Sequence, residues 1–153
     1  MKHENIKIAK HEIRIIGIKC SVKPEETTKT LGVLWDTFNA ENLAQTIPNQ
    51  AKPGSLYCVY TDYRRDGSYN AILGCAVDSI ETIPTDMTHI DIAAGPYARY
   101  AVGGEMPAAL IHCWNTINST PLDYQRAFKT DFDYYTPEAL EGKGDVFVYV
   151  GIK

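Results

Sequence analysis

The feature that most constrains the fold of this 153-residue chain is an internal repeat built around two amphipathic helices. Each predicted helix has a proline near its start, Pro24 or Pro107, and carries apolar residues at positions i, i+3, i+4 and i+7. The two apolar stripes are Leu31, Leu34, Trp35 and Phe38 in the first helix, and Leu110, Cys113, Trp114 and Ile117 in the second. Because each helix follows a strand and precedes a pair of strands, the sequence predicts two β-α-β-β units.

Short runs of β-branched and aromatic residues supply the predicted strands, and Arg64-Arg65-Asp66-Gly67 predicts a hairpin turn between two of them. The predicted strands cover residues 5–22 (one long or broken strand), 56–63, 69–77, 89–93, 97–102, 131–135 and 146–152. Each unit is too small to bury its own apolar face, so the two should pack together. We expect one α+β domain over residues 1–153, with repeats near 5–80 and 88–153. It should have an antiparallel sheet, an approximate two-fold axis and a central cleft.

The composition excludes several classes of function. A net charge of −4, a pI near 5.5 and the absence of a basic run argue against direct binding of nucleic acid. Charges within the first four residues and the lack of a long apolar run predict neither a signal peptide nor a membrane span.

The cysteines and histidines are scattered along the chain and form no metal-binding pattern. The four cysteines, each in an apolar segment, are Cys20, Cys58, Cys75 and Cys113. We expect buried free thiols in a cytoplasmic protein, with no metal and no cofactor, because Gly103-Gly104 also lacks the spacing of a phosphate-binding loop.

The stretch Asp131-Phe132-Asp133-Tyr134-Tyr135 is the most unusual of the predicted strands. Alternation puts Asp133 and Tyr135 on one face, and the repeat aligns them with Cys58 and Tyr60. If the two hairpins face each other, these four side chains converge on the central cleft. Because burying an unpaired charge is costly, Asp133 either lies on a wet face or waits in an aromatic pocket for a positive partner. The remaining acids are expected to be solvated surface charges: Asp36, Asp62, Asp91, Glu105 and Asp131.

Aromatic side chains are the main candidates for the walls of the cleft. Strand tyrosines are favoured because a buried hydroxyl needs a partner, and these are Tyr60, Tyr100, Tyr135 and Tyr149. Trp35, Phe38 and Trp114 lie on the helix stripes, where they could belong either to the core or to the cleft. Aromatic walls favour flat hydrophobic ligands, and a desolvated carboxylate adds a preference for cations.

The chain resembles the GyrI-like small-molecule-binding domain, also called the AraC-type or bacterial transcription activator effector-binding domain, over essentially all of its length. The resemblance is carried by Tyr57-Cys58-Val59-Tyr60, Ala94-Gly95-Pro96-Tyr97-Ala98-Arg99-Tyr100, the helix ending in Trp114, Phe132-Asp133-x-Tyr135, and Val146-Phe147-Val148-Tyr149-Val150. It implies a duplicated β-α-β-β fold whose aromatic pocket binds lipophilic, often cationic compounds. A buried glutamate of that family pairs with the ligand, and Asp133, one methylene shorter, occupies its position.

The resemblance is to the stand-alone form, without a DNA-binding domain, and it implies binding or sequestration of hydrophobic cationic small molecules. The expected ligand-binding residues are Asp133, Tyr135, Tyr60, Cys58, Trp35, Phe38, Trp114, Tyr149 and Tyr100. Two alternatives stay open: a hydrolase of electrophilic compounds, in which Asp133 activates water, and a protein-binding modulator of the gyrase-inhibitor type. A homodimer or a protein partner is left open as well.

Overall fold

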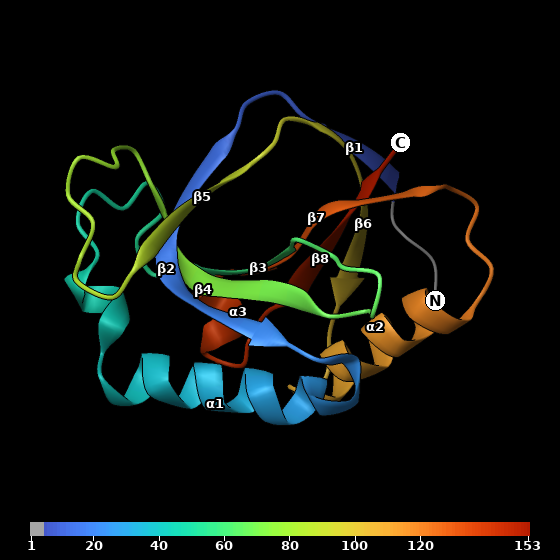
Figure 1. Ribbon diagram of the computed structural model, residues 1–153, viewed down its shortest axis with the longest axis horizontal. Coiled ribbons are helices and arrows are strands. Elements are labelled where there is room, and N and C mark those ends of the chain that lie inside the picture. Colours follow the sequence, from blue (N-terminus) through green and yellow to red (C-terminus); the bar gives the residue numbers. More distant parts are fainter. Residues whose placement is uncertain (1–4) are drawn as a thin grey trace.

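The computed structural model describes residues 5–153 as an α+β fold with one eight-stranded antiparallel sheet, as predicted (Figure 1). Residues 1–4, whose charges entered the prediction about a signal peptide, lie outside the described part. The strands are β1 (Asn5–Ala9), β2 (Ile13–Val22), β3 (Leu56–Thr61), β4 (Tyr69–Val77), β5 (Thr88–Ile92), β6 (Gly95–Val102), β7 (Arg126–Tyr135) and β8 (Val146–Ile152). The helices are α1 (Thr27–Ala40), α2 (Ala108–Ser119) and the short α3 (Pro137–Leu140), with 3-10 turns at Pro24–Glu26 and Leu43–Thr46.

The strand order β1-β6-β8-β7-β3-β4-β2-β5 is symmetric about its centre. Strands β3 and β7 pair in the middle, and β4 and β8, β2 and β6, and finally β5 and β1 follow at equal distances on either side. The units β2-α1-β3-β4 and β6-α2-β7-β8 therefore confirm the duplicated β-α-β-β architecture. The boundaries of the repeats, near 5–80 and 88–153, stay a prediction.

The two halves exchange their edge strands. The predicted strand over residues 5–22 is broken: β1 pairs with β6 of the second half, while β2 pairs with β4 and β5. Strands β2 and β4 approach very closely where Gly17 faces Gly74, since a Cβ on Gly17 would lie 2.1 Å from the Leu73 carbonyl oxygen. Glycine at both positions lets the backbones of β2 and β4 approach more closely than side chains would allow.

The helices lie on one side of the sheet (Figure 1), and the two faces of the sheet belong to two different cores. Buried residues of α1 and α2, such as Leu34, Phe38 and Cys113, pack with Cys58 and Tyr60 on the helix-covered face. The opposite face carries Ile15, Tyr57, Val59, Ile72, Tyr97 and Phe132. Because side chains alternate along a strand, β7 sends its aspartates to the helix-covered face and Phe132 to the other.

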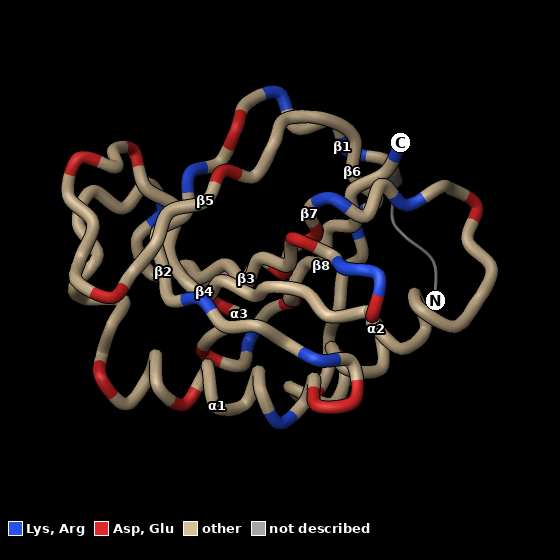
Figure 2. Tube along the Cα trace, in the orientation of Figure 1, with Lys and Arg blue, Asp and Glu red and all other residues tan. Residues whose placement is uncertain are grey.

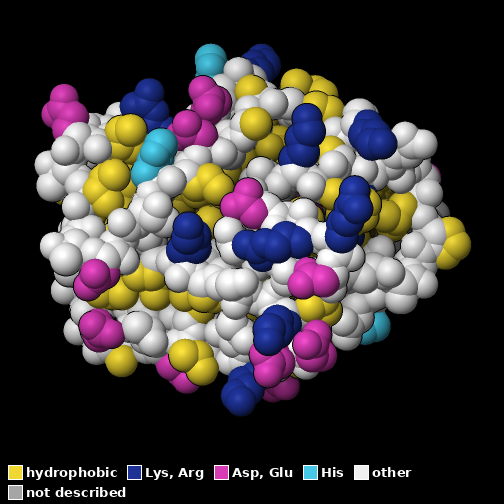
Figure 3. Space-filling model, in the orientation of Figure 1, with side chains coloured by type: hydrophobic (Ala, Val, Ile, Leu, Met, Phe, Trp, Pro, Cys, Tyr) yellow, Lys and Arg dark blue, Asp and Glu magenta, His cyan; other side chains and the backbone are white. Residues whose placement is uncertain are grey.

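Charged residues of both signs are interspersed along the chain (Figure 2), and on the face shown in Figure 3 they alternate with apolar side chains. Within residues 5–153, no helix is long and apolar enough to cross a membrane. The helix-covered face of the sheet is where strands of both halves meet the two main helices, and it is the place to look for a site.

Candidate functional site

A cleft of about 990 Å³ opens on the helix-covered face between the start of α1 and the helix α2. Its walls also include the β3–β4 hairpin and the beginning of β7. Five aromatic side chains line it, and we call it the aromatic cleft: Tyr60, Tyr63, Tyr69, Trp114 and Phe128. Leu31 and Leu110 add apolar surface, while Glu25, Glu26, Lys29, Arg64 and Arg126 bring charges of both signs to its lining. A cavity of this size and aromatic content suits a small organic molecule.

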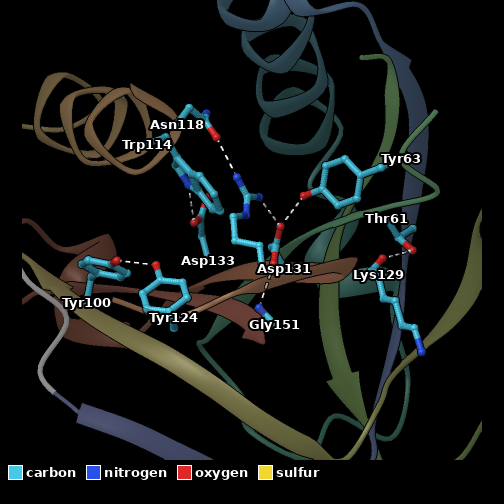
Figure 4. Close-up of polar contacts among 11 residues, drawn as sticks. Thr61, Tyr63, Tyr100, Trp114, Asn118, Tyr124, Lys129, Asp131, Asp133 and Gly151 are labelled. Atoms are coloured by element: carbon cyan, nitrogen blue, oxygen red, sulfur yellow. Dashed lines mark hydrogen bonds and ion pairs between the residues drawn. The ribbon is translucent and has the colours of Figure 1, made fainter. Parts of the chain in front are cut away.

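Asp133 lies directly behind two of these rings. It sits on β7 between Cys58 of β3 and Val148 of β8, and its exposed fraction is 0%. The Tyr60 hydroxyl donates to Oδ2 at 2.5 Å. The Trp114 indole Nε1–H donates to Oδ1 at 2.9 Å (Figure 4). Among residues 5–153 no ion pair involves Asp133, so a fully buried carboxyl group is held by neutral donors alone.

The environment of Asp133 raises its pKa from the ordinary value of 3.8 to about 7. Burial is the main cause, because a desolvated carboxylate is less stable than the protonated acid, and the nearby negative charge of Asp131 acts in the same direction. The hydrogen bonds from Tyr60 and Trp114 oppose this shift, since both stabilise the carboxylate. Near neutral pH the group can therefore exist in either form.

The rings around Asp133 contact one another edge to face. Tyr60 lies perpendicular to Trp114, with ring centroids 5.6 Å apart, and nearly perpendicular to Tyr69 at 5.8 Å. Tyr135, two residues beyond Asp133 on the same face, packs against Trp35 of α1 at 4.8 Å. Such pairs contribute roughly 0.5–1.5 kcal/mol each beyond the burial of their area, which holds the wall in a defined shape.

The structure brings together part of the predicted site. Tyr60 and Trp114 line the aromatic cleft, and Cys58 and Tyr135 are buried beside Asp133 on the same face. Trp35 covers Tyr135 rather than the cleft. The other predicted residues lie elsewhere.

The three remaining predicted residues also lie away from the cleft. Phe38 is buried in the core beneath α1, and Tyr100 is buried on β6, where its hydroxyl meets that of Tyr124. Tyr149 lies on the opposite face of the sheet, stacked on Phe132 with centroids 4.5 Å apart. Phe132 and Tyr149 are register partners on β7 and β8, which puts both side chains on the face away from Asp133.

A second buried acid, Asp131, corrects the expectation that this residue is a solvated surface charge. Its exposed fraction is 0%. It accepts hydrogen bonds from Arg126 Nη2 at 2.8 Å, the Tyr63 hydroxyl at 2.5 Å and the Gly151 backbone N–H at 2.8 Å (Figure 4). Three donors, one of them a guanidinium, satisfy the Asp131 carboxylate, and its partner Arg126 lines the cleft.

The side chain of Arg126 joins this pair to the cleft. Its guanidinium also donates to Asn118 Oδ1 at 2.7 Å and stands over two rings, 4.4 Å from the centroid of Phe128 and 5.8 Å from that of Trp114. The register of β7 against β8 shifts between Arg126 and Asp131, and Phe128 within this bulge has a φ of 53°. An exposed aromatic residue in the left-handed region is unusual and marks this edge of the cleft.

Four residues that line the cleft were not predicted from the sequence: Tyr63, Tyr69, Phe128 and Arg126. A signal existed for the two tyrosines, because they flank the predicted hairpin turn on either side. For Phe128 and Arg126 no local pattern indicated the bulge that turns them toward the cleft.

Metal and thiol chemistry receive no support from this part of the molecule. No group of three or more His, Cys, Asp or Glu side chains in residues 5–153 is arranged to hold a metal ion. The four cysteines are free thiols, three of them buried and Cys20 half-buried. A cytoplasmic location stays a prediction based on them.

Comparisons with known proteins agree with this architecture. The profile of the Cass2 family, described as integron-associated effector binding proteins, matches residues 8–152. An integron cassette protein from the mobile metagenome of Vibrio cholerae has a similar structure, with a TM-score of 0.76, 22% identity and coverage of 99% of this chain and 98% of that one. No curated protein matches the chain.

Two more solved structures are similar in fold. SAV2435, solved bound to tetraphenylphosphonium, gives a TM-score of 0.73 at 14% identity, covering 100% of this chain and 94% of its own. A putative bacterial transcription regulation protein from Staphylococcus aureus gives 0.75 at 13% identity, covering 100% and 99%. At these identities the likeness concerns the fold alone.

Proposed function

Because the chain belongs to the Cass2 family of integron-associated effector-binding proteins, we propose that it binds hydrophobic, positively charged small molecules in the aromatic cleft, with Asp133 as the counter-charge. The family match confirms the resemblance to GyrI-like effector-binding domains that the sequence indicated. The observation that carries the proposal is the state of Asp133: it is fully buried, hydrogen-bonded by neutral groups, and outside every ion pair of residues 5–153.

The energetics of such a carboxylate favour a cationic ligand. An unpaired buried charge is costly, and a positive group brought near it relieves part of that cost because Coulomb interactions are strong where water is excluded. A neutral ligand of the same shape leaves the carboxylate unpaired, and an anion repels it. Selectivity then comes from the penalty on the wrong ligand as much as from attraction to the right one.

Tyr60 and Trp114 connect the ligand to the buried charge. Both line the cleft and both direct their polar hydrogens at Asp133, so the carboxylate polarises the two rings and makes them richer in electrons. A cation resting on such rings gains roughly 0.5–2 kcal/mol from each cation–π contact. The tetraphenylphosphonium bound by SAV2435, a similar fold, is a ligand of this chemistry and supports the proposal.

The test uses two ions of nearly identical shape and opposite charge, tetraphenylphosphonium and tetraphenylborate. Binding can be followed by quenching of tryptophan fluorescence, because Trp114 lines the cleft whereas Trp35, the other tryptophan, packs against Tyr135. We expect micromolar binding of the cation and roughly hundredfold weaker binding of the anion, a difference of about 3 kcal/mol. Replacing Asp133 by the isosteric amide, Asp133→Asn, should remove most of that difference.

A matched control is Asp36→Asn, which makes the same chemical change at an exposed aspartate of α1 outside the cleft. It should leave the preference for the cation intact. Equal binding of the two ions by the unaltered protein would contradict the proposal, and so would an unchanged preference in Asp133→Asn.

A further inference from the structure

The hydrogen bonds of Asp133 are compatible with both of its protonation states. When it is ionised, Oδ2 accepts from the Tyr60 hydroxyl and Oδ1 from the Trp114 indole. When it is protonated on Oδ2, that O–H can donate to the Tyr60 oxygen, because a phenolic hydroxyl both donates and accepts. The site therefore holds the acid in place whether or not it carries a charge.

The other groups around Asp133 do not titrate near neutral pH. The titratable groups facing it are Cys58 and Tyr60 on β3, Tyr69 on β4, Tyr135 on β7 and Cys113 on α2. Burial raises the pKa of every one of them, that of Cys113 to about 12, so all remain neutral. From β8 the register partner is Val148, which has no titratable group.

The remaining charges near Asp133 balance each other. Asp131, on the same face of β7, is paired with Arg126, whose guanidinium lies over the Trp114 ring, 5.8 Å from its centroid, and makes no ion pair with Asp133 among residues 5–153. His112, although on α2, is exposed to solvent. The acids Glu25 and Glu26 also line the cleft, on the turn before α1. Among the described groups that face Asp133, its own carboxyl is therefore the one that can change its charge near neutral pH when a cation enters the cleft.

We propose that Asp133 exchanges a proton for the positive charge of the ligand, so that binding of a cation releases a proton to solvent. This inference rests on the proposed function. The O–H bond of the carboxyl breaks, the proton passes to water or buffer, and the resulting carboxylate keeps the hydrogen bonds from Tyr60 and Trp114 while it pairs with the ligand. The empty site thus holds no unpaired buried carboxylate, because Asp133 ionises when the cationic ligand binds.

Proton exchange sets a quantitative relation between pH and affinity. With the pKa of Asp133 at about 7 in the empty protein, binding should release about 0.9 proton per cation at pH 6 and about 0.1 at pH 8. The apparent association constant should be nearly constant above about pH 8 and should fall by up to roughly tenfold for each pH unit below 7.

The experiment is calorimetric titration of the full chain with tetraphenylphosphonium at pH 6 and at pH 8, each in several buffers of different protonation enthalpy. The slope of the observed enthalpy against the buffer's protonation enthalpy counts the protons released. A slope near one at pH 6 that falls toward zero at pH 8 supports the exchange. Binding with no release and no pH dependence overturns it and leaves the proposed function standing, whereas no binding at any pH overturns the proposed function itself.

Two variants locate the proton. Asp133→Asn should abolish the release at both pH values, while Asp36→Asn, outside the cleft, should leave it unchanged. If Asp133→Asn fails to fold, Trp114→Phe tests the same assignment. This variant keeps an aromatic ring but removes a hydrogen bond that lowers the pKa of Asp133. The midpoint of proton release should therefore move to higher pH, and an unmoved midpoint overturns the assignment to Asp133.

Discussion

Asp131 and Asp133 occupy the same strand and the same face, two residues apart, and neither exposes any surface to solvent. Asp131 receives a guanidinium, a phenol and a backbone N–H, so its charge is compensated within the chain. Asp133 receives a phenol and an indole, and no cation from residues 5–153. The difference teaches that burial alone does not define the role of an acid: the first completes the structure, whereas we propose that the second receives its partner from a ligand.

Trp114 contacts Asp133 directly and Asp131 through the partner of that acid, Arg126. Its indole N–H donates to Asp133, while Arg126, the partner of Asp131, lies over its ring. Arg126 is a cation placed between two aromatic rings beside a buried carboxylate, and these are the contacts that we propose for a ligand at Asp133. The Arg126–Asp131 pair thus shows, within the chain, the contacts that we propose between Asp133 and a cationic ligand.

The largest expected effect comes from removing the internal cation. Arg126→Met should destabilise the protein by about 3–5 kcal/mol, because it leaves Asp131 buried and unpaired. Adding Asp131→Asn to that variant should recover a large part of the loss, since the uncompensated charge is then gone. Urea unfolding of the two single variants and the double variant measures this, and a double variant no more stable than Arg126→Met would contradict it.

A second prediction concerns the pH dependence of stability at Asp133. Its pKa is higher in the folded state, about 7, than the ordinary 3.8, so the native protein holds this proton more tightly than the unfolded chain does. The stabilisation is present in full below about pH 4 and is lost as the pH rises to about 7. The unfolding free energy of the wild type should fall across that window relative to Asp133→Asn, by at most about 4 kcal/mol.

Chemical denaturation of both proteins at pH 4, 6 and 8 measures this difference directly. All other titrating groups are shared by the two proteins and cancel in the comparison. A difference that stays constant over the three pH values, or that changes in the opposite direction, would show that Asp133 is ionised at all of them.

The parts of the fold that sequence analysis predicted depend on local periodicity. Leu110 and Trp114 recur at helical spacing, and Asp133 and Tyr135 alternate with Phe132 in the strand, so the apolar stripe and the shared face follow from chain geometry alone. The repeat then added a long-range expectation, because aligning Asp133 with Cys58 predicted that the two side chains converge if the two hairpins face each other. These two residues are indeed register partners at the centre of the sheet.

The parts that could not be predicted depend on register and irregularity. Tyr149 shares a face with Phe132 because the two are register partners, and one residue of slip would have turned its ring to the side of Asp133. The partners of Asp131 come from the loop after β3, from the bulge in β7 and from the backbone of β8. No spacing in the sequence indicates that these segments meet.

Removing one tyrosine hydroxyl at a time tests how Asp131 and Asp133 differ in their dependence on a neutral hydrogen-bond donor. Tyr60→Phe deletes a hydrogen bond to Asp133 and should cost about 1–3 kcal/mol at pH 8. At pH 5 the cost should be smaller, because a protonated carboxyl depends less on that donor. Tyr63→Phe is the matched change at Asp131 and should cost a similar amount, while the Arg126 guanidinium and the Gly151 N–H still contact that carboxylate. Unfolding free energies of both variants at the two pH values decide the point.

The smallest expected effect concerns Phe128, where two substitutions distinguish the contribution of the backbone conformation from that of the ring. The residue has a φ of 53°, which costs an ordinary side chain roughly 1–2 kcal/mol and glycine almost nothing. Phe128→Gly should therefore be about 1 kcal/mol more stable than Phe128→Ala. Both variants lose the ring that covers Arg126 and lines the cleft, so both should bind tetraphenylphosphonium a few-fold more weakly and to the same extent. If only the alanine variant lost affinity, the backbone of the bulge, and not the ring, would be what holds the ligand beside the paired acid.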